Sequence, residues 1–189
     1  MLIAISGSQS TGKSTLIQRL NNLGFYTVER KTSRSILSEW GITLNEINNN
    51  RALTLDFQQE IIKRKVLDEQ EAFESDEIYI TERSFADLFS YFLLSSGFDN
   101  SASDFINNYY GKCVRLQNIY EHVFYLNSGL FNLEMDDVRG NNEHYANLVD
   151  HTMLRYTKQI TDPDKLTIID TANMDDRITT ITDWIYNFE

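Results

Sequence analysis

The chain has 189 residues, with 17 lysines and arginines against 28 aspartates and glutamates, so its formal net charge at pH 7 is −11. This acidic balance argues against a protein that binds duplex nucleic acid by neutralising phosphates over a broad surface. The one cysteine excludes an internal disulfide framework and a thiolate-rich zinc site. The length and the 41% hydrophobic content favour one compact domain spanning residues 1–189.

The first residues form a short apolar run without a basic segment before it, which is not typical of a signal peptide. No stretch reaches the roughly 20 apolar residues that are needed to cross a bilayer. We therefore expect a reduced, cytoplasmic protein without a membrane partner.

Short strand-like runs alternate with longer helix-like segments along the chain. Because each short apolar run is separated from the next by a helix, the pattern predicts an α/β fold whose five-stranded parallel sheet is covered by helices on both faces. In chain order, the expected elements are a strand at 2–6, a helix at 14–23, a strand at 25–28, helices at 33–40 and 51–74, a strand at 78–81, helices at 85–94 and 101–121, a strand at 122–126, a helix at 142–160, a strand at 166–170 and a helix at 175–188.

The segment Gly7–Thr15 matches the phosphate-binding pattern G-x-x-x-x-G-K-[ST] and lies between the first strand and the first helix. Its two glycines can adopt backbone angles closed to other residues, and the amides at the helix N-terminus would face the phosphates. Lys13 would bridge the β- and γ-phosphates of ATP, and the Ser14 hydroxyl would bind Mg²⁺. The expected nucleotide-binding residues of this loop are Gly7, Ser10, Thr11, Gly12, Lys13, Ser14 and Thr15.

A phosphate-binding loop does not choose a reaction by itself. A GTPase needs an Asn-Lys-x-Asp motif, but the chain has no Asn-Lys pair, and the Asp-x-x-Gly match at 137–140 follows the fourth strand without a partner motif. Ring-forming motor ATPases usually need a longer chain with a helical lid domain. Phosphoryl transfer to a small acceptor remains, and this reaction requires a base and mobile arginines near the acceptor.

Charged and polar residues follow the predicted strands where ligands bind in open α/β sheets. These residues are Glu29, Arg30 and Arg34 after the second strand, Glu82, Arg83 and Ser84 after the third, Asp136, Asp137 and Arg139 after the fourth, and Asp170, Asn173 and Arg177 after the fifth.

In this order of segments the chain resembles small P-loop kinases, above all the AAA-domain family that includes ribosylnicotinamide kinase. The resemblance extends over nearly the whole chain. The tripeptide Glu82-Arg83-Ser84 also resembles the Glu-Arg-Ser motif of deoxyribonucleoside kinases and the Asp-Arg pair of thymidylate kinases. The segments that carry the family resemblance are the loop at 7–15, the stretch from Glu29 to Arg34, the helix with Phe57-Gln58-Gln59, the third strand with its charged pair, and Asp137-Val138-Arg139.

The resemblance implies a P-loop NTPase three-layer sandwich with a lid segment at about 128–145, and an ATP- and Mg²⁺-dependent kinase acting on a nucleoside or nucleoside monophosphate. It would make Glu29 the base or positioning group for the acceptor hydroxyl. Glu82 would hold Mg²⁺ through water, and Arg83 would contact the acceptor. Arg139 would close over the γ-phosphate, and Asn173 and Arg177 would contact adenine.

Alternatives stay open. The acceptor could be a hydroxyl on a modified base in DNA, since Arg30, Lys31 and Arg34 form a local basic rim, although the acidic balance opposes this. The chain could also be a regulatory module that binds ATP and hydrolyses it slowly or not at all. Glu29 could be a solvated loop carboxylate, the charged pair on the third strand a structural ion pair, and Arg139 part of a surface salt bridge. The protein could be a monomer or a homodimer.

Overall fold

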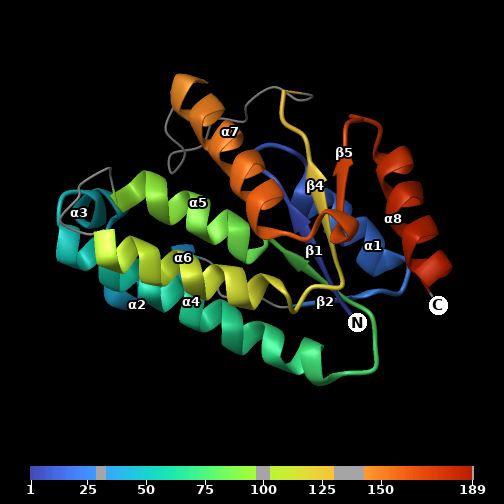
Figure 1. The fold of residues 1–189 in the computed structure, drawn as a ribbon, viewed down its shortest axis with the longest axis horizontal. Helices are drawn as coiled ribbons and strands as arrows, with labels where there is room; N and C mark the ends of the chain where they lie inside the picture. The colour runs from blue at the N-terminus through green and yellow to red at the C-terminus, as the bar shows by residue number, and fades with distance from the viewer. Residues whose placement is uncertain (29–32, 97–102, 130–142, 189) are drawn as a thin grey trace.

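The computed structural model describes residues 1–28, 33–96, 103–129 and 143–188 (Figure 1). Five parallel strands form one sheet in the order β2-β3-β1-β4-β5. The predicted α/β fold is therefore confirmed. The strands are β1 (Leu2–Ser6), β2 (Tyr26–Thr27), β3 (Tyr79–Glu82), β4 (His122–Leu126) and β5 (Leu166–Ile169).

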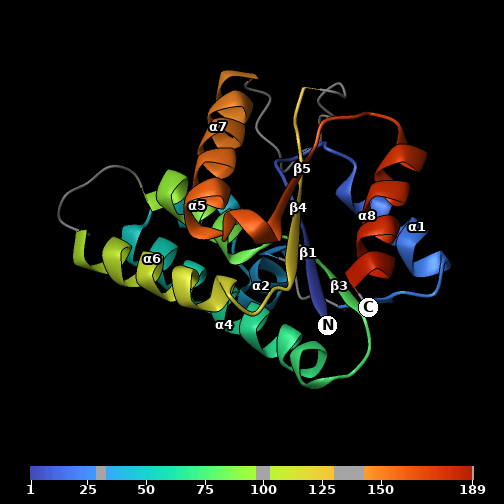
Figure 2. The ribbon, with the colours of Figure 1, turned by 45° about the vertical axis from the view of Figure 1, so that its right-hand side comes forward.

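Helices cover both faces of the sheet, so the molecule has three layers. Figure 2 shows α1 and α8 on one face and α4 to α7 on the other. None of the helices in the described residues is long and apolar enough to span a membrane. The helices are α1 (Lys13–Asn22), α2 (Ser33–Trp40), α3 (Leu44–Asn48), α4 (Arg51–Glu74), α5 (Phe85–Ser96), α6 (Ser103–Gln117), α7 (Glu143–Ile160) and α8 (Met174–Phe188), with one 3₁₀ turn at Pro163–Lys165.

The central strand β1 is buried on both sides, which explains its continuous run of apolar residues. Leu2 and Ala4 pack into the core on the α4–α7 face, where α5 and α6 supply many aromatic rings. Ile3 and Ile5 point to the opposite face and pack against the aliphatic side chains of α1 and α8. Side chains that alternate in this way fix the register of the strand, because a shift by one residue would exchange the two cores.

Most element boundaries agree with the expectation from sequence, and the differences have local causes. The second strand is only two residues long and lies at the edge of the sheet, where it pairs with β3 alone. The helix predicted at 101–121 ends earlier, at Gln117, and its expected first residues fall outside the described part of the chain. The structure also contains α3, which was not expected from sequence, a short helix whose Thr43 and Glu46 form a reciprocal capping box.

The order of the strands determines where a ligand can bind. The chain leaves β1 for β2 and β3 on one side and later crosses to β4 on the other, so β1 has β3 and β4 as its neighbours. In open α/β sheets, ligands bind beyond the carboxyl ends of the strands at such a reversal of strand order. The candidate site therefore lies where β1 and β3 end.

Candidate active site

The loop between β1 and α1 has the backbone geometry of an anion-binding loop. Gly7 has a φ of 136°, Ser10 of 58° and Gly12 of 82°, and Gly12 directly precedes the first residue of α1. A Cβ atom at Gly7 would lie 2.7 Å from the carbonyl oxygen of Leu126, so only glycine fits at this point. The loop therefore aims the N-terminus of α1 at the space above the sheet, where an anion would be stabilised.

Lys13 is buried in this loop and is held there by the loop itself. Its Nζ donates hydrogen bonds to the carbonyl oxygen of Ser8 at 2.5 Å and to Oγ1 of Thr11 at 3.1 Å. Thr11 Oγ1 in turn donates to the same carbonyl at 3.0 Å. A charged phosphate oxygen is a stronger acceptor for an ammonium group than a neutral carbonyl. The lysine thus already lies within the loop in which a phosphate would bind.

Ser14 and Glu82 bring two hard oxygen donors together at the ends of α1 and β3. Ser14 Oγ donates to Glu82 Oε2 at 3.4 Å. No group of three His, Cys, Asp or Glu side chains that could hold a metal occurs in the described residues. Mg²⁺ needs no such group, since it is usually held by one or two side-chain oxygens together with phosphates and water. The pair fits Mg²⁺ bound with a nucleotide.

The turn that follows β3 has an unusual backbone. Arg83 has a φ of 68°, although it is not a glycine, and such a conformation persists only when its surroundings hold it. Its amide donates to the carbonyl oxygen of Ile5 at 2.9 Å, and the amide of Ser84 donates to Oδ2 of Asp87 at 3.2 Å. The turn therefore directs the side chains of Glu82 and Arg83 to different partners.

The Arg83 guanidinium lies against the ring of Tyr91, 4.7 Å from the ring centroid. Its Nη1 is buried and makes no hydrogen bond within the part of the chain that the structure describes. Burial lowers the pKa of Arg83, but the Tyr91 hydroxyl and the neighbouring carboxylates outweigh this effect and raise the pKa above its usual value. Arg83 thus provides a fixed positive charge at this end of the sheet, and its contact with an acceptor stays a prediction.

Asp87 connects the turn to the phosphate loop. Besides the Ser84 amide, it accepts a hydrogen bond from the hydroxyl of Ser6, the last residue of β1. Burial raises the pKa of Asp87, while the nearby Arg83 charge and the Ser6 hydrogen bond lower it. Asp87 was not among the predicted site residues, although the spacing Ser84-x-x-Asp87 is a capping pattern that indicates it.

A cavity of about 640 Å³ opens beside the Ser14–Glu82 pair, bounded by α1, β2, β3 and the start of α2. It brings together predicted residues from three segments of the chain, and its walls are about equally polar and apolar. It is lined by Ser14, Ile17, Gln18, Asn21, Thr27, Val28, Ser33, Arg34, Ile80, Glu82 and Arg83.

The two residues expected near adenine lie at the turn between β5 and α8. Asn173 is the N-cap of α8, where its Oδ1 accepts a hydrogen bond from the amide of Asp175 at 2.9 Å. Arg177 is fully buried and donates to the carbonyl oxygens of Thr11 at 2.5 Å and Thr171 at 2.6 Å. Burial lowers the pKa of Arg177. Both residues support the adjacent loops, and contact of either one with adenine stays a prediction.

Two predicted catalytic residues, Glu29 and Arg139, lie outside the described residues, as does most of the expected lid segment at 128–145. Their roles stay predictions. Of the other predicted site residues, the structure brings Lys13, Ser14, Glu82 and Arg83 to one end of the sheet.

The glycine-rich loop between β1 and α1, with its buried lysine and an acidic residue at the end of the neighbouring strand, defines a P-loop NTPase fold. A family model described as an AAA domain matches residues 2–177. The chain therefore belongs to this family, as the resemblance in its sequence indicated.

Solved structures with this fold include two kinds of nucleotide-binding protein. The chain is similar to deoxyadenosine kinase from M. mycoides with bound dATP, with a TM-score of 0.71 and 16% identity over 98% of this chain and 100% of that one. For the same kinase with bound dCTP, the TM-score is 0.68 and the sequence identity is 15%, over 99% of this chain and 100% of that one. For NadR protein in complex with NAD and AMP-PNP, the TM-score is 0.57 and the sequence identity is 15%, over 96% of this chain and 48% of that chain.

At these identities the likeness shows the fold alone. No curated protein gives a significant sequence match to the chain.

Proposed function

We propose that the protein is an ATP- and Mg²⁺-dependent kinase that phosphorylates a nucleoside or a nucleoside monophosphate. The observation that carries this proposal is the Ser14–Glu82 pair, which lies between the phosphate loop and the cavity that Arg83 lines. A donor site and an acceptor-sized cavity thus meet at a pair of oxygens suited to Mg²⁺. The similar folds of deoxyadenosine kinase, which binds dATP, and of NadR protein, which binds AMP-PNP, support the same conclusion.

The donor half would bind the triphosphate of ATP. The loop amides and the N-terminus of α1 would bind the phosphate oxygens, and Lys13 would exchange its contact with the Ser8 carbonyl for the β- and γ-phosphates. Ser14 and Glu82 would hold Mg²⁺, which neutralises charge on the phosphates when it is bound.

The acceptor half would use the cavity. Arg83 and Arg34 line it and supply positive charge to an acceptor, and Arg83 would contact the acceptor itself. Glu29, carried over from the family resemblance, would accept the proton of the acceptor hydroxyl, and Arg139 would approach the γ-phosphate.

The transfer itself follows from this arrangement. The acceptor oxygen forms a bond to the γ-phosphorus while the bond from that phosphorus to the β–γ bridging oxygen breaks, so that ADP leaves. Little covalent chemistry falls to the protein in such a transfer, and catalysis comes from positioning and from stabilising charge on the phosphoryl oxygens. Lys13 and the loop amides are the described groups placed to do this.

The test is ADP release from ATP and Mg²⁺ in the presence of a panel of nucleosides and nucleoside monophosphates. We expect release that depends on one class of acceptor and is lost in Lys13→Met. ADP release that no member of the panel stimulates would overturn the proposal.

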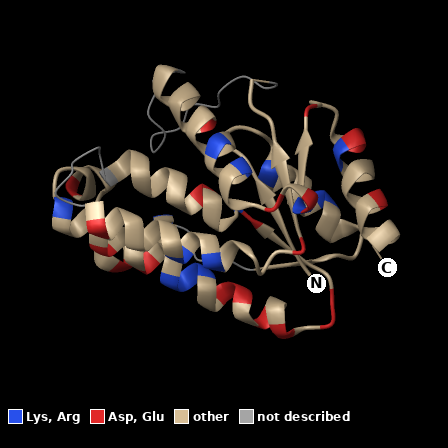
Figure 3. Cartoon of the chain, viewed as in Figure 1, with Lys and Arg blue, Asp and Glu red and all other residues tan. Residues whose placement is uncertain are grey.

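DNA as acceptor has less support. Figure 3 shows lysine and arginine mixed with aspartate and glutamate on several helices of the described residues, rather than gathered into one stripe. A parallel assay with γ-labelled ATP and DNA separates the two acceptors, because transfer of label to DNA alone would identify the polymer as the substrate.

A further inference from the structure

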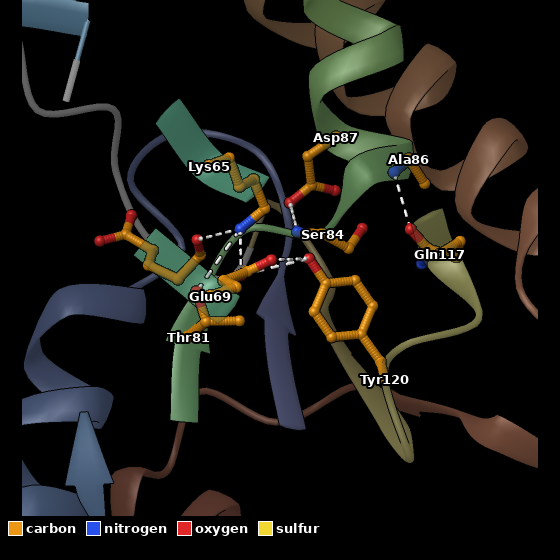
Figure 4. Close-up of polar contacts among 9 residues, drawn as sticks. Lys65, Glu69, Thr81, Ser84, Ala86, Asp87, Gln117 and Tyr120 are labelled. Carbon is orange, nitrogen blue, oxygen red and sulfur yellow. Dashed lines mark hydrogen bonds and ion pairs between the residues drawn. The ribbon is translucent and has the colours of Figure 1, made fainter. Parts of the chain in front are cut away.

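A buried ion pair lies on α4, beneath the turn that follows β3. Lys65 and Glu69 are one helical turn apart, each 1% exposed, with Nζ 2.6 Å from Oε1. The hydroxyl of Tyr120 donates to the other carboxylate oxygen of Glu69 at 2.9 Å. Figure 4 shows the Tyr120 hydroxyl and the Lys65 ammonium both meeting Glu69. We call these three residues the α4 network.

Stability alone does not account for such a pair. Removing two charges from water costs free energy that their attraction often fails to recover, and well-packed apolar residues of similar volume are frequently as stable or more so. The pair also lies beside the core rings of Phe85 and Tyr120, where apolar side chains would pack readily. A buried pair at such a place calls for a function in fixing the local structure.

Lys65 extends from the ion pair toward the turn. Its Nζ lies 3.4 Å from Oγ1 of Thr81 and 3.5 Å from the carbonyl oxygen of Glu82. The same ammonium is 5.5 Å from the ring centroid of Phe85, the first residue of α5. Glu69 orients the ammonium, which thereby contacts residues on both sides of the turn.

The peptide between Glu82 and Arg83 is consequently held at both ends. Its carbonyl oxygen faces Lys65, while its amide donates to Ile5 on the neighbouring strand. This peptide leads into the residue with a φ of 68°. Because that conformation is costly for a residue with a side chain, it needs such contacts to persist.

We propose that the α4 network positions this peptide and so sets the direction of the Glu82 carboxylate toward Ser14 and of the Arg83 guanidinium toward Tyr91. Lys65 is then a positioning residue for the Mg²⁺-ATP site, acting through the Glu82 carbonyl without touching metal or nucleotide. The part that concerns Mg²⁺-ATP rests on the proposed function, whereas the effect on the backbone does not.

The test replaces the pair by apolar residues of similar size, Lys65→Met with Glu69→Leu, which leaves no buried charge behind. The matched control is Glu60→Leu with Arg64→Met, an ion pair at the same helical spacing on α4 whose further partners are Glu39 and Lys63 and not residues of the turn. Binding of ATP is titrated with and without Mg²⁺.

We expect the Mg²⁺ concentration for half-maximal enhancement of ATP binding to rise about tenfold or more in the Lys65–Glu69 variant, as is usual when the support of a metal ligand is removed. Affinity for ATP without Mg²⁺ should stay the same, and the control variant should match the wild type in both. An unchanged Mg²⁺ dependence would overturn the positioning role at the metal.

A crystal structure of the same variant measures the backbone directly. We expect Arg83 to leave the positive φ region and the Glu82 carboxylate to move away from Ser14, and an unchanged turn would overturn the proposal. If the wild type binds no ATP, the proposed function fails while the crystal still decides the positioning role. If the double variant does not fold, Tyr120→Phe is tested in its place. We expect a smaller rise in the Mg²⁺ concentration for half-maximal enhancement of ATP binding, and no rise would overturn the proposal.

Discussion

The phosphate loop and the Glu82–Ser84 turn end neighbouring strands, but they are held in different ways. Within the loop, Lys13 donates hydrogen bonds to Ser8 and Thr11, so these contacts join residues a few positions apart. The turn also depends on residues farther along the chain, since Lys65 of α4 and Ile5 of β1 supply partners besides the nearby Asp87. The phosphate loop is thus encoded by a contiguous motif, whereas the turn forms only once the sheet and its helices have assembled.

The largest effect should come from a substitution in the phosphate loop. Lys13→Met removes the cation that the loop holds, and we expect kcat to fall about 10²–10³-fold, the usual loss when one charge-stabilising donor is removed. Turnover with the best acceptor of the panel measures it. Because the loop is held locally, the unfolding midpoint should stay close to that of the wild type, and a large drop in stability would show that the loop also supports the fold.

Asp87→Ala tests the support of the turn that follows β3. It leaves the Ser6 hydroxyl and the Ser84 amide buried without their acceptor, and each such group costs about 1–3 kcal/mol. We expect the free energy of unfolding to drop by about 2–3 kcal/mol, together with weaker acceptor-dependent turnover. Asp87→Asn keeps an acceptor for the amide and should lose less than half as much. Equal free energies of unfolding in urea for both variants and the wild type would show that these hydrogen bonds of Asp87 do not stabilise the fold.

The pH dependence of stability tests the packing around His122, whose ring lies against Trp184 of α8. Burial, with a smaller effect of Lys165, lowers the pKa of His122 from 6.5 to about 4. Between these values the unfolded chain binds a proton that the folded chain does not, so stability falls as the pH is lowered through this window.

At pH 5 this effect amounts to about 2 kcal/mol relative to pH 7.5. His122→Gln, which can still bond to Thr167, should lose less stability between the two values, as measured by urea unfolding. The same loss in both proteins would assign the pH dependence to other groups.

The smallest effect is expected away from the site. Thr43→Ala removes the capping box of α3 and should lower the free energy of unfolding by about 1 kcal/mol. Since α3 packs on α4 far from the turn in sequence, turnover and Mg²⁺ dependence should not change. A change in kcat would mean that this region also positions the site.

The same contrast explains what could be predicted from the sequence. The loop, the order of strands and helices, and the placement of charged residues after β3 follow from spacing and apolar periodicity, which are local properties. The positive φ of Arg83, the contact of Lys65 with the Glu82 carbonyl and the burial of Arg177 could not be predicted, because each depends on residues that meet only in three dimensions. Asp87 is intermediate, since its capping pattern is local but its bond to Ser6 is not.

The bond from Arg177 to the Thr11 carbonyl also has a consequence for synthesis of the protein. It joins residues 166 positions apart, so a nascent chain completes the phosphate loop early but lacks the support beneath it until the final helix has left the ribosome. Translation therefore supplies this contact long after it has supplied the glycine-rich motif. A product cut short before α8 would carry the whole glycine-rich motif and still lack this contact.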